Sequence, residues 1–132
     1  MKTNRLLSVL ILLWCVLMTT SAKTIEVRTS LWSGSQAMGN WEKWVKIDAS
    51  VFANAEVGQV IDVHVSGLDA TSTYHQVMLN NSSWATLSGS EAVSIFSAPA
   101  DARFKITDAM LADLKSGGLI VKGCYYTADA VY

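Results

Sequence analysis

The stretch VIDVHVS at residues 60–66 decides the fold, because apolar and polar residues alternate along its whole length. A period of two places the apolar side chains on one face of a β-strand and the polar side chains on the other. The inward face is expected to carry Ile61, Val63 and Val65, and the outward face Asp62, His64 and Ser66. The stretch therefore predicts a half-buried strand.

Shorter alternations of the same kind flank this strand on both sides. They predict further strands at 24–28, 44–48, 74–79, 92–96, 103–106, 119–122 and 125–131. Gly, Ser, Asn and Asp separate these segments, as expected for turns. The inward positions predict a core of Ile25, Val27, Val45, Ile47, Ile61, Val63, Val65, Val77, Leu79, Ile106 and Ile120.

One segment departs from this period and predicts a single short helix near 108–115. Thr107 is suited to the N-cap, and Asp108 places a negative charge in the first turn. Lys115, followed by glycines at 117 and 118, is a helix stop signal. The patterns in the rest of the sequence after residue 23 predict strands and turns.

Many short strands with little helix predict an all-β antiparallel sandwich or barrel in a single domain. With 51% hydrophobic residues, the 132-residue chain is too apolar to be disordered. Ten basic residues against eleven acidic ones leave no net positive charge for a nucleic-acid partner. Two cysteines are too few for a disulfide framework or a four-thiolate zinc site.

Residues 1–22 have the pattern of a signal peptide. Lys2 and Arg5 form a basic region, an apolar run follows, and the small residues Thr20, Ser21 and Ala22 come last. The apolar run of about 13 residues is shorter than the roughly 20 that span a bilayer. We expect cleavage near Ala22, an exported product at 23–132 and no membrane association afterwards; a retained N-terminal anchor is the alternative.

Residues with catalytic chemistry form no distinctive pattern. Cys124 has two histidines as possible bases, but a short apolar run precedes it, which is typical of a buried cysteine. Those histidines are eleven residues apart, which is no recognised metal-ligand spacing. Glu42, Glu91 and Asp101 lie in loop-like segments and could supply a glycosidase pair, but a solvated carboxylate explains each of them equally well. We therefore predict that the protein is not an enzyme.

The tryptophans carry more information. Trp32, Trp41 and Trp84 lie in stretches rich in Gly, Ser and Asn, where an indole ring needs either a core to enter or a ligand to contact. A flat indole beside amide groups complements the C–H face and the hydroxyl rim of a sugar. Trp44 is next to a predicted strand and is expected to be structural or peripheral.

Several stretches resemble small β-sandwich modules found in exported proteins and polysaccharide-degrading enzymes of Bacteroidetes. The resemblance rests on LWSGSQ at 31–36, GNW at 39–41, VGQVI at 57–61, SWATL at 83–87 and LIVKG at 119–123. These modules are similar to the galactose-binding-like jelly-roll carbohydrate-binding modules. The resemblance implies a jelly roll of two antiparallel sheets without catalytic residues, in some members with a structural calcium, for which this sequence offers no compact acidic loop.

The resemblance also implies two places for a ligand. A site on a sheet face would use Tyr74 and Gln76, whereas a site on the loops at one end would use Trp32, Trp41 and Trp84. These five residues are our predicted ligand-binding set, and a glycan or polysaccharide is the predicted partner.

The predicted function is an exported, non-catalytic carbohydrate-binding module that needs no cofactor. The alternative is a structural or protein-interaction module of the cell envelope. The two differ in one observable, because a binding module exposes its tryptophans and a structural module buries them.

Overall fold

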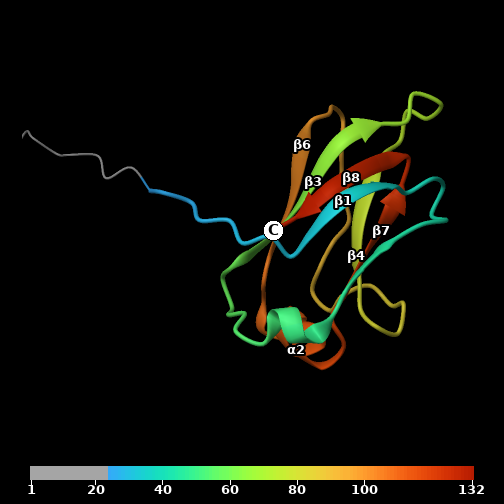
Figure 1. The fold of residues 1–132 in the computed structure, drawn as a ribbon. Helices are drawn as coiled ribbons and strands as arrows, with labels where there is room; N and C mark the ends of the chain where they lie inside the picture. Colours follow the sequence, from blue (N-terminus) through green and yellow to red (C-terminus); the bar gives the residue numbers. More distant parts are fainter. Residues whose placement is uncertain (1–23) are drawn as a thin grey trace, which may run out of the picture.

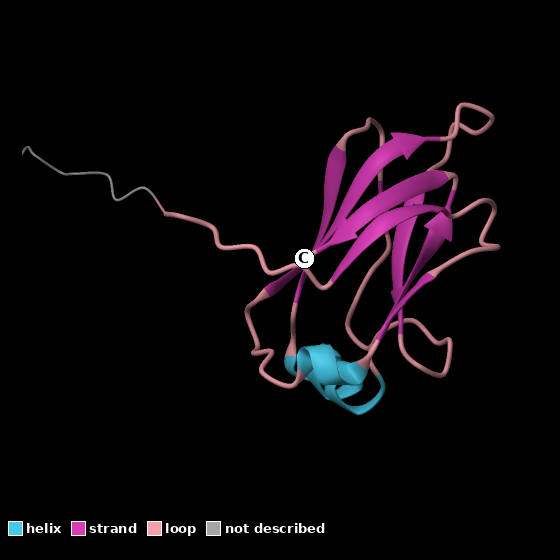
Figure 2. Cartoon of the chain, viewed as in Figure 1, coloured by secondary structure: helices cyan, strands magenta, loops and turns pink. Residues whose placement is uncertain are grey.

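Residues 24–132 are described in the computed structural model, and within this range eight strands form two antiparallel sheets that pack face to face (Figures 1 and 2). The predicted signal peptide at 1–22 lies outside the described residues. The first sheet, here the β3 sheet, has the order β1 (Trp32–Ala37), β8 (Tyr126–Val131), β3 (Val60–Leu68) and β6 (Ala100–Lys105). The second, here the β7 sheet, has the order β2 (Val45–Ile47), β7 (Leu119–Cys124), β4 (Gln76–Asn80) and β5 (Val93–Ser94).

The strand orders 1-8-3-6 and 2-7-4-5 are those of a jelly roll. Each sheet takes strands from both halves of the chain, so the central strands β3, β7, β8 and β4 have partners on both sides. The predicted all-β sandwich is therefore confirmed. Within residues 24–132, no helix has the length and apolar character required to cross a membrane.

Nine of the eleven residues predicted for burial are buried, and eight of them lie in the core between the two sheets; the ninth, Ile120, was predicted there too but points outward. Val63, Val65, Val77 and Leu79 have no exposed surface, as the alternation in β3 and β4 predicts. Ile120 is buried but lies outside the core cluster, a point that bears on the site below.

The strand predicted at 24–28 is wrong, and so is the burial of Ile25 and Val27, which are largely exposed. The segment alternates in sequence, but pairing with β8 begins only near Trp32, so the segment has no neighbouring strand. The side chains of Glu26 and Arg28 instead make ion pairs with β3 and β6.

The sequence interpretation missed strand β1. Its residues 33–35 are Ser, Gly and Ser, which have low strand propensity and read as a loop. The strand forms because β8 supplies a partner, from Trp32 opposite Val131 to Ala37 opposite Thr127.

The predicted helix is confirmed as α2 (Asp108–Gly117), with Thr107 as the N-cap whose side chain accepts a hydrogen bond from the Met110 N–H. It ends at Gly118, where φ is +77° and a Cβ atom would lie 2.3 Å from the Ile47 carbonyl oxygen. A short 3-10 helix, η1 (Ala49–Phe52), was not predicted; the Asp48 side chain caps it by accepting from the Ser50 N–H at 2.9 Å.

Candidate functional site

The outer face of the β7 sheet is defined by the residues that alternate with the core positions. Since Val77 and Leu79 point inward, Gln76 and Met78 point outward from β4. Lys122 is paired with Met78 and shares its face. The outward positions of β2, β7 and β4 include Lys46, Ile120, Lys122, Gln76 and Met78.

Two tryptophans meet above this face. The ring centroids of Trp44 and Trp84 are 4.8 Å apart and their planes are nearly perpendicular, at 87°. Trp44 precedes β2 and Trp84 follows β4, and because β7 lies between those strands, the rings meet over β7. The side chains remain 45% and 48% exposed. Their geometry forms an open corner of two apolar surfaces.

Ile120 is the apolar residue of β7 on this outer face. It points outward, opposite Asn80 on one side and Lys46 on the other, yet it is only 3% exposed and lies outside the core cluster. Its strand neighbours are Asn80, which leads into the loop at 81–85, and Lys46, which lies two residues after Trp44. Ile120 is therefore a buried apolar residue on the same outer face as the two rings.

The loop at 81–85 holds Trp84 through a set of short hydrogen bonds. The Asn81 Oδ1 atom accepts from the N–H groups of Ser83 at 3.0 Å and Ala85 at 3.2 Å. The backbone N–H of Trp84 donates to the Asn81 carbonyl at 3.0 Å, and the Asn80 side-chain amide donates to the Trp84 carbonyl at 2.7 Å. The backbone of Trp84 is therefore fixed before any ligand arrives.

Among residues 24–132, the non-glycine residues with positive φ are all aromatic: Trp41, Trp84 and Tyr125. A bulky residue in this region costs on the order of 1–3 kcal/mol and persists only where its surroundings enforce it. For Trp84, the hydrogen bonds of the 81–85 loop provide that enforcement. Such strain concentrates at binding sites, which makes Trp41 and Trp84 notable.

A second group of aromatic residues lies near the other end of β4. Gln76 pairs with Ser94, and continuing this register by two residues places Phe96 opposite Tyr74. The Ile95 N–H donates to the His75 carbonyl, which supports the continued pairing. Phe96 is 89% exposed, and sequence reasoning did not single it out.

The predicted ligand-binding residues divide between the two sheets. Trp84 and Gln76 lie on the outer face of the β7 sheet, and Tyr74 lies two residues before the start of β4. Trp41 follows Asn40, which forms a bridge with Cys124 at the end of β7.

Trp32 lies elsewhere, on β1 of the β3 sheet. Its ring packs against the core and approaches Gly34 so closely that a Cβ there would be 2.8 Å away. Trp44, expected to be structural or peripheral, is half exposed and contacts Trp84. Its outward position could have been found from Lys46, two residues further along the same face.

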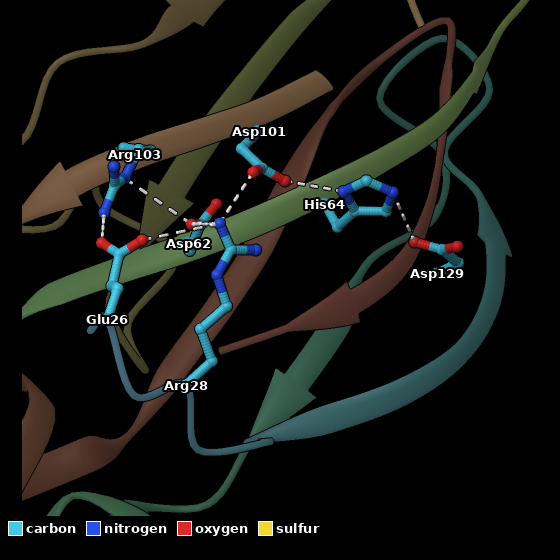
Figure 3. A network of polar contacts seen from close by, with 7 residues as sticks. All are labelled: Glu26, Arg28, Asp62, His64, Asp101, Arg103 and Asp129. Atoms are coloured by element: carbon cyan, nitrogen blue, oxygen red, sulfur yellow. Dashed lines mark hydrogen bonds and ion pairs between the residues drawn. The ribbon is translucent and has the colours of Figure 1, made fainter. Parts of the chain in front are cut away.

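The outer face of the β3 sheet has a different chemistry, a network of ion pairs (Figure 3). The Arg28 guanidinium lies 3.2 Å from Asp62 and 3.0 Å from Asp101, and the His64 Nδ1 atom lies 2.6 Å from Asp101. The network joins Glu26, Arg28, Asp62, His64, Asp101, Arg103 and Asp129. It fastens the segment before β1 to β3 and β6.

The carboxyl groups of this network have opposite pKa shifts. Burial raises the pKa of Asp62, and the neighbouring Asp101 charge raises it further. Hydrogen bonds from His64 and Arg28 lower the pKa of Asp101, the former having the larger effect. Asp101 is thus engaged in structural ion pairs, which argues against a free catalytic carboxylate at that position.

The remaining candidates for catalysis and metal binding are equally unpromising. Cys124 has no exposed surface, and burial raises the pKa of its thiol, so a reactive thiolate is disfavoured. Residues 24–132 contain no group of three or more His, Cys, Asp or Glu side chains that could hold a metal ion. A structural calcium remains a prediction without assigned ligands.

A cavity of about 510 Å³ lies between the segment at 26–31, the loop at 51–59 and the start of β3. Its lining contains no tryptophan. The one orphan acceptor at its wall, the Asp62 Oδ1 atom, has almost no accessible surface, so a ligand could not reach that atom. The aromatic face is the better candidate for a binding site.

The chain is thus a jelly roll that carries two half-exposed tryptophans on the outer face of one sheet. Among solved structures, the chain is similar to SGBP-B of the Bacteroides ovatus mixed-linkage glucan utilization locus, in complex with a mixed-linkage heptasaccharide. The two share 25% identity with a TM-score of 0.64, over 78% of this chain and 27% of that one. This chain thus corresponds to about a quarter of that protein. No protein-family model and no curated protein sequence matches the chain.

Proposed function

We propose that this protein is an exported, non-catalytic polysaccharide-binding module whose site is the outer face of the β7 sheet. The observation that carries the proposal is the Trp44–Trp84 pair, in which both residues are about half exposed on the outer face of a sheet. Exposed indole surface is unfavourable in water unless a ligand covers it. The same proposal includes that the module is of the galactose-binding-like type.

The chemistry of the face suits a sugar chain. The two perpendicular rings offer apolar surface to the C–H faces of pyranose units, and Gln76 offers an amide to their hydroxyl groups. Tyr74 and Phe96 extend the apolar surface along the β4 direction. From Tyr74 to Met78 the chain advances four residues, which corresponds to about 13 Å and is enough for more than one sugar unit. The similarity to SGBP-B, a protein solved with an oligosaccharide, supports this proposal.

Export is the second part of the proposal. The predicted signal at 1–22 would be removed near Ala22, and the module would act outside the cytoplasm. Intact-mass measurement of the protein recovered from an exporting host should give Lys23 as the first residue. Recovery of a product that keeps Met1 would contradict this part and leave the binding site untouched.

The binding site can be tested with Trp84→Ala. Affinity electrophoresis against mixed-linkage glucan and other plant glycans, followed by calorimetry on the best ligand, should show about tenfold weaker binding. That factor corresponds to about 1.4 kcal/mol, the amount expected for one lost aromatic contact with its buried area. The unfolding free energy should fall by only about 1 kcal/mol, because the Trp44 contact is lost but the core is intact.

Val57→Ala is the matched control, since Val57 is 49% exposed and lies in the turn before β3, away from the tryptophans. It should leave the affinity unchanged. Equal affinity of the Trp84→Ala variant and the unsubstituted protein would refute the site. Strong destabilisation by Trp84→Ala would instead favour the structural or interaction module of the envelope.

A further inference from the structure

The two outer faces of the sandwich differ in charge. Residues 24–132 contain seven basic and eleven acidic side chains, so the described part of the protein is net acidic. The strands of the β3 sheet carry Asp62, Asp101 and Asp129 against Arg103 and Lys105, a net charge of −1. The strands of the β7 sheet carry Lys46 and Lys122 and no Asp or Glu. The aromatic face is thus the cationic face of an acidic module.

Lys122 is the central cation of this face. It lies on β7, and its ammonium nitrogen is 5.4 Å from the centroid of the Trp84 ring. The ring quadrupole attracts the ammonium group and keeps it beside the indole. No carboxylate of residues 24–132 lies within ion-pair distance of Lys122, whereas Arg28 and Arg103 are each paired with acidic side chains.

Lys46 adds a second positive charge on the same side. It is opposite Ile120 on β7, two residues from Lys122, which corresponds to a spacing of about 7 Å along the strand. Trp44 lies two residues before Lys46 in the sequence, on the same face of the sheet. Two cations therefore flank the corner formed by the two indole rings.

We propose that this site prefers acidic glycans, with Lys122 contacting a carboxylate or sulfate group of the sugar that stacks on Trp84. This proposal rests on the proposed glycan-binding function and names its ligand class. A neutral hydroxyl gains little from an ammonium group that water already solvates, whereas an anionic group forms a charge-assisted hydrogen bond with it. The ammonium group would exchange part of its contact with the ring for the anion.

The overall negative charge of the module sets a condition on this recognition. A polyanion is repelled at long range by the acidic side chains, but charges more than about 8 Å apart are largely screened at physiological ionic strength. The local cations then dominate at the aromatic corner. Binding of acidic chains should consequently weaken at high salt, and stacking of neutral chains should not.

The experiment compares polygalacturonate, dextran sulfate and neutral mixed-linkage glucan by calorimetry at 0.15 M and 0.5 M NaCl. At the lower salt concentration, an acidic chain should bind at least tenfold more tightly than the neutral one. Lys122→Gln should remove that preference and leave neutral binding within twofold. Lys122→Arg, which keeps the charge, should retain the preference. Lys105→Gln, on the edge strand of the opposite sheet, is the matched control. It should change neither the preference for acidic chains nor the affinity for the neutral chain.

Which acidic chain binds better identifies the anionic group, carboxylate or sulfate, and either result supports the proposal. Equal binding of acidic and neutral chains, or an acidic preference that survives Lys122→Gln, would overturn it while the glycan-binding function stands. Failure of all three chains to bind the unsubstituted protein would overturn both.

Discussion

Asn81→Ala should loosen the loop that presents Trp84 without touching the ring or the core. The substitution removes the Oδ1 atom that accepts hydrogen bonds from the N–H groups of Ser83 and Ala85, at 3.0 and 3.2 Å. The backbone hydrogen bonds between Asn81 and Ala85 and between Trp84 and Asn81 remain possible. The variant therefore tests the contribution of the Asn81 side chain, which also hydrogen-bonds Asp113 of α2.

The magnitude follows from the two lost contacts. A hydrogen bond contributes about 0.5–1.5 kcal/mol net, and water can partly replace Asn81 in an exposed loop, so the loss should be about 1–2 kcal/mol. For a domain of roughly 110 residues this corresponds to a fall in Tm of about 4–10 °C. Glycan affinity should fall about two- to fivefold, because the Trp84 side chain must be ordered again on binding.

Thermal and urea unfolding followed by tryptophan fluorescence measure the stability, and calorimetry with the best glycan measures the affinity. Ser83→Ala is the control, since it changes the same loop and the Ser83 hydroxyl makes no hydrogen bond within residues 24–132. Its Tm should stay within about 2 °C of the unsubstituted protein. Identical Tm values for the two variants would refute the role assigned to the Asn81 side chain.

Two further predictions concern the scaffold. Gly123→Ala should lower stability by about 3 kcal/mol or more, because φ is +148° and the new Cβ would lie 1.9 Å from the Gln76 carbonyl oxygen. Gly67→Ala, whose Cβ would meet nothing within 4 Å, should be nearly neutral, and equal urea midpoints for the two would contradict the packing. Asp101→Asn should lower stability at neutral pH by about 1 kcal/mol, because the hydrogen bond from His64 holds the pKa of Asp101 below its usual range. Since a lowered pKa stabilises only while the group is ionised, the difference should vanish between pH 5 and pH 2, and a constant difference would refute it.

The fold could be predicted where the local pattern determines the face of a strand. The alternation at 60–66 placed Ile61, Val63 and Val65 correctly because a period of two leaves only one way to bury them. The same pattern failed at Ile25 and Val27, since alternation does not supply a neighbouring strand. Strand β1, by contrast, is present but was not predicted, because its stability comes from pairing with residues almost a hundred positions away.

The site was less predictable for a related reason. The loop composition around Trp84 indicated an exposed ring, and the ring is half exposed. Trp44 was set aside because its local sequence reads as the start of a strand, and only the order β2-β7-β4 brings it to Trp84. Phe96 was missed for the same cause, since its place opposite Tyr74 depends on the pairing of β4 with β5.

One signal for the site was nevertheless present in β7. Leu119, Ile120 and Val121 are three consecutive apolar residues, and all three are buried. A strand with one face in water should not carry an apolar residue at the middle position, so such a run indicates that both faces are covered at this point. The inner face is covered by the core, and Ile120, which points outward, is only 3% exposed. The two rings contact each other, the loop at 81–85 holds the backbone of Trp84, and both residues stay about half exposed. A ligand that stacks on them meets apolar groups that are already ordered, so little side-chain entropy is lost on binding.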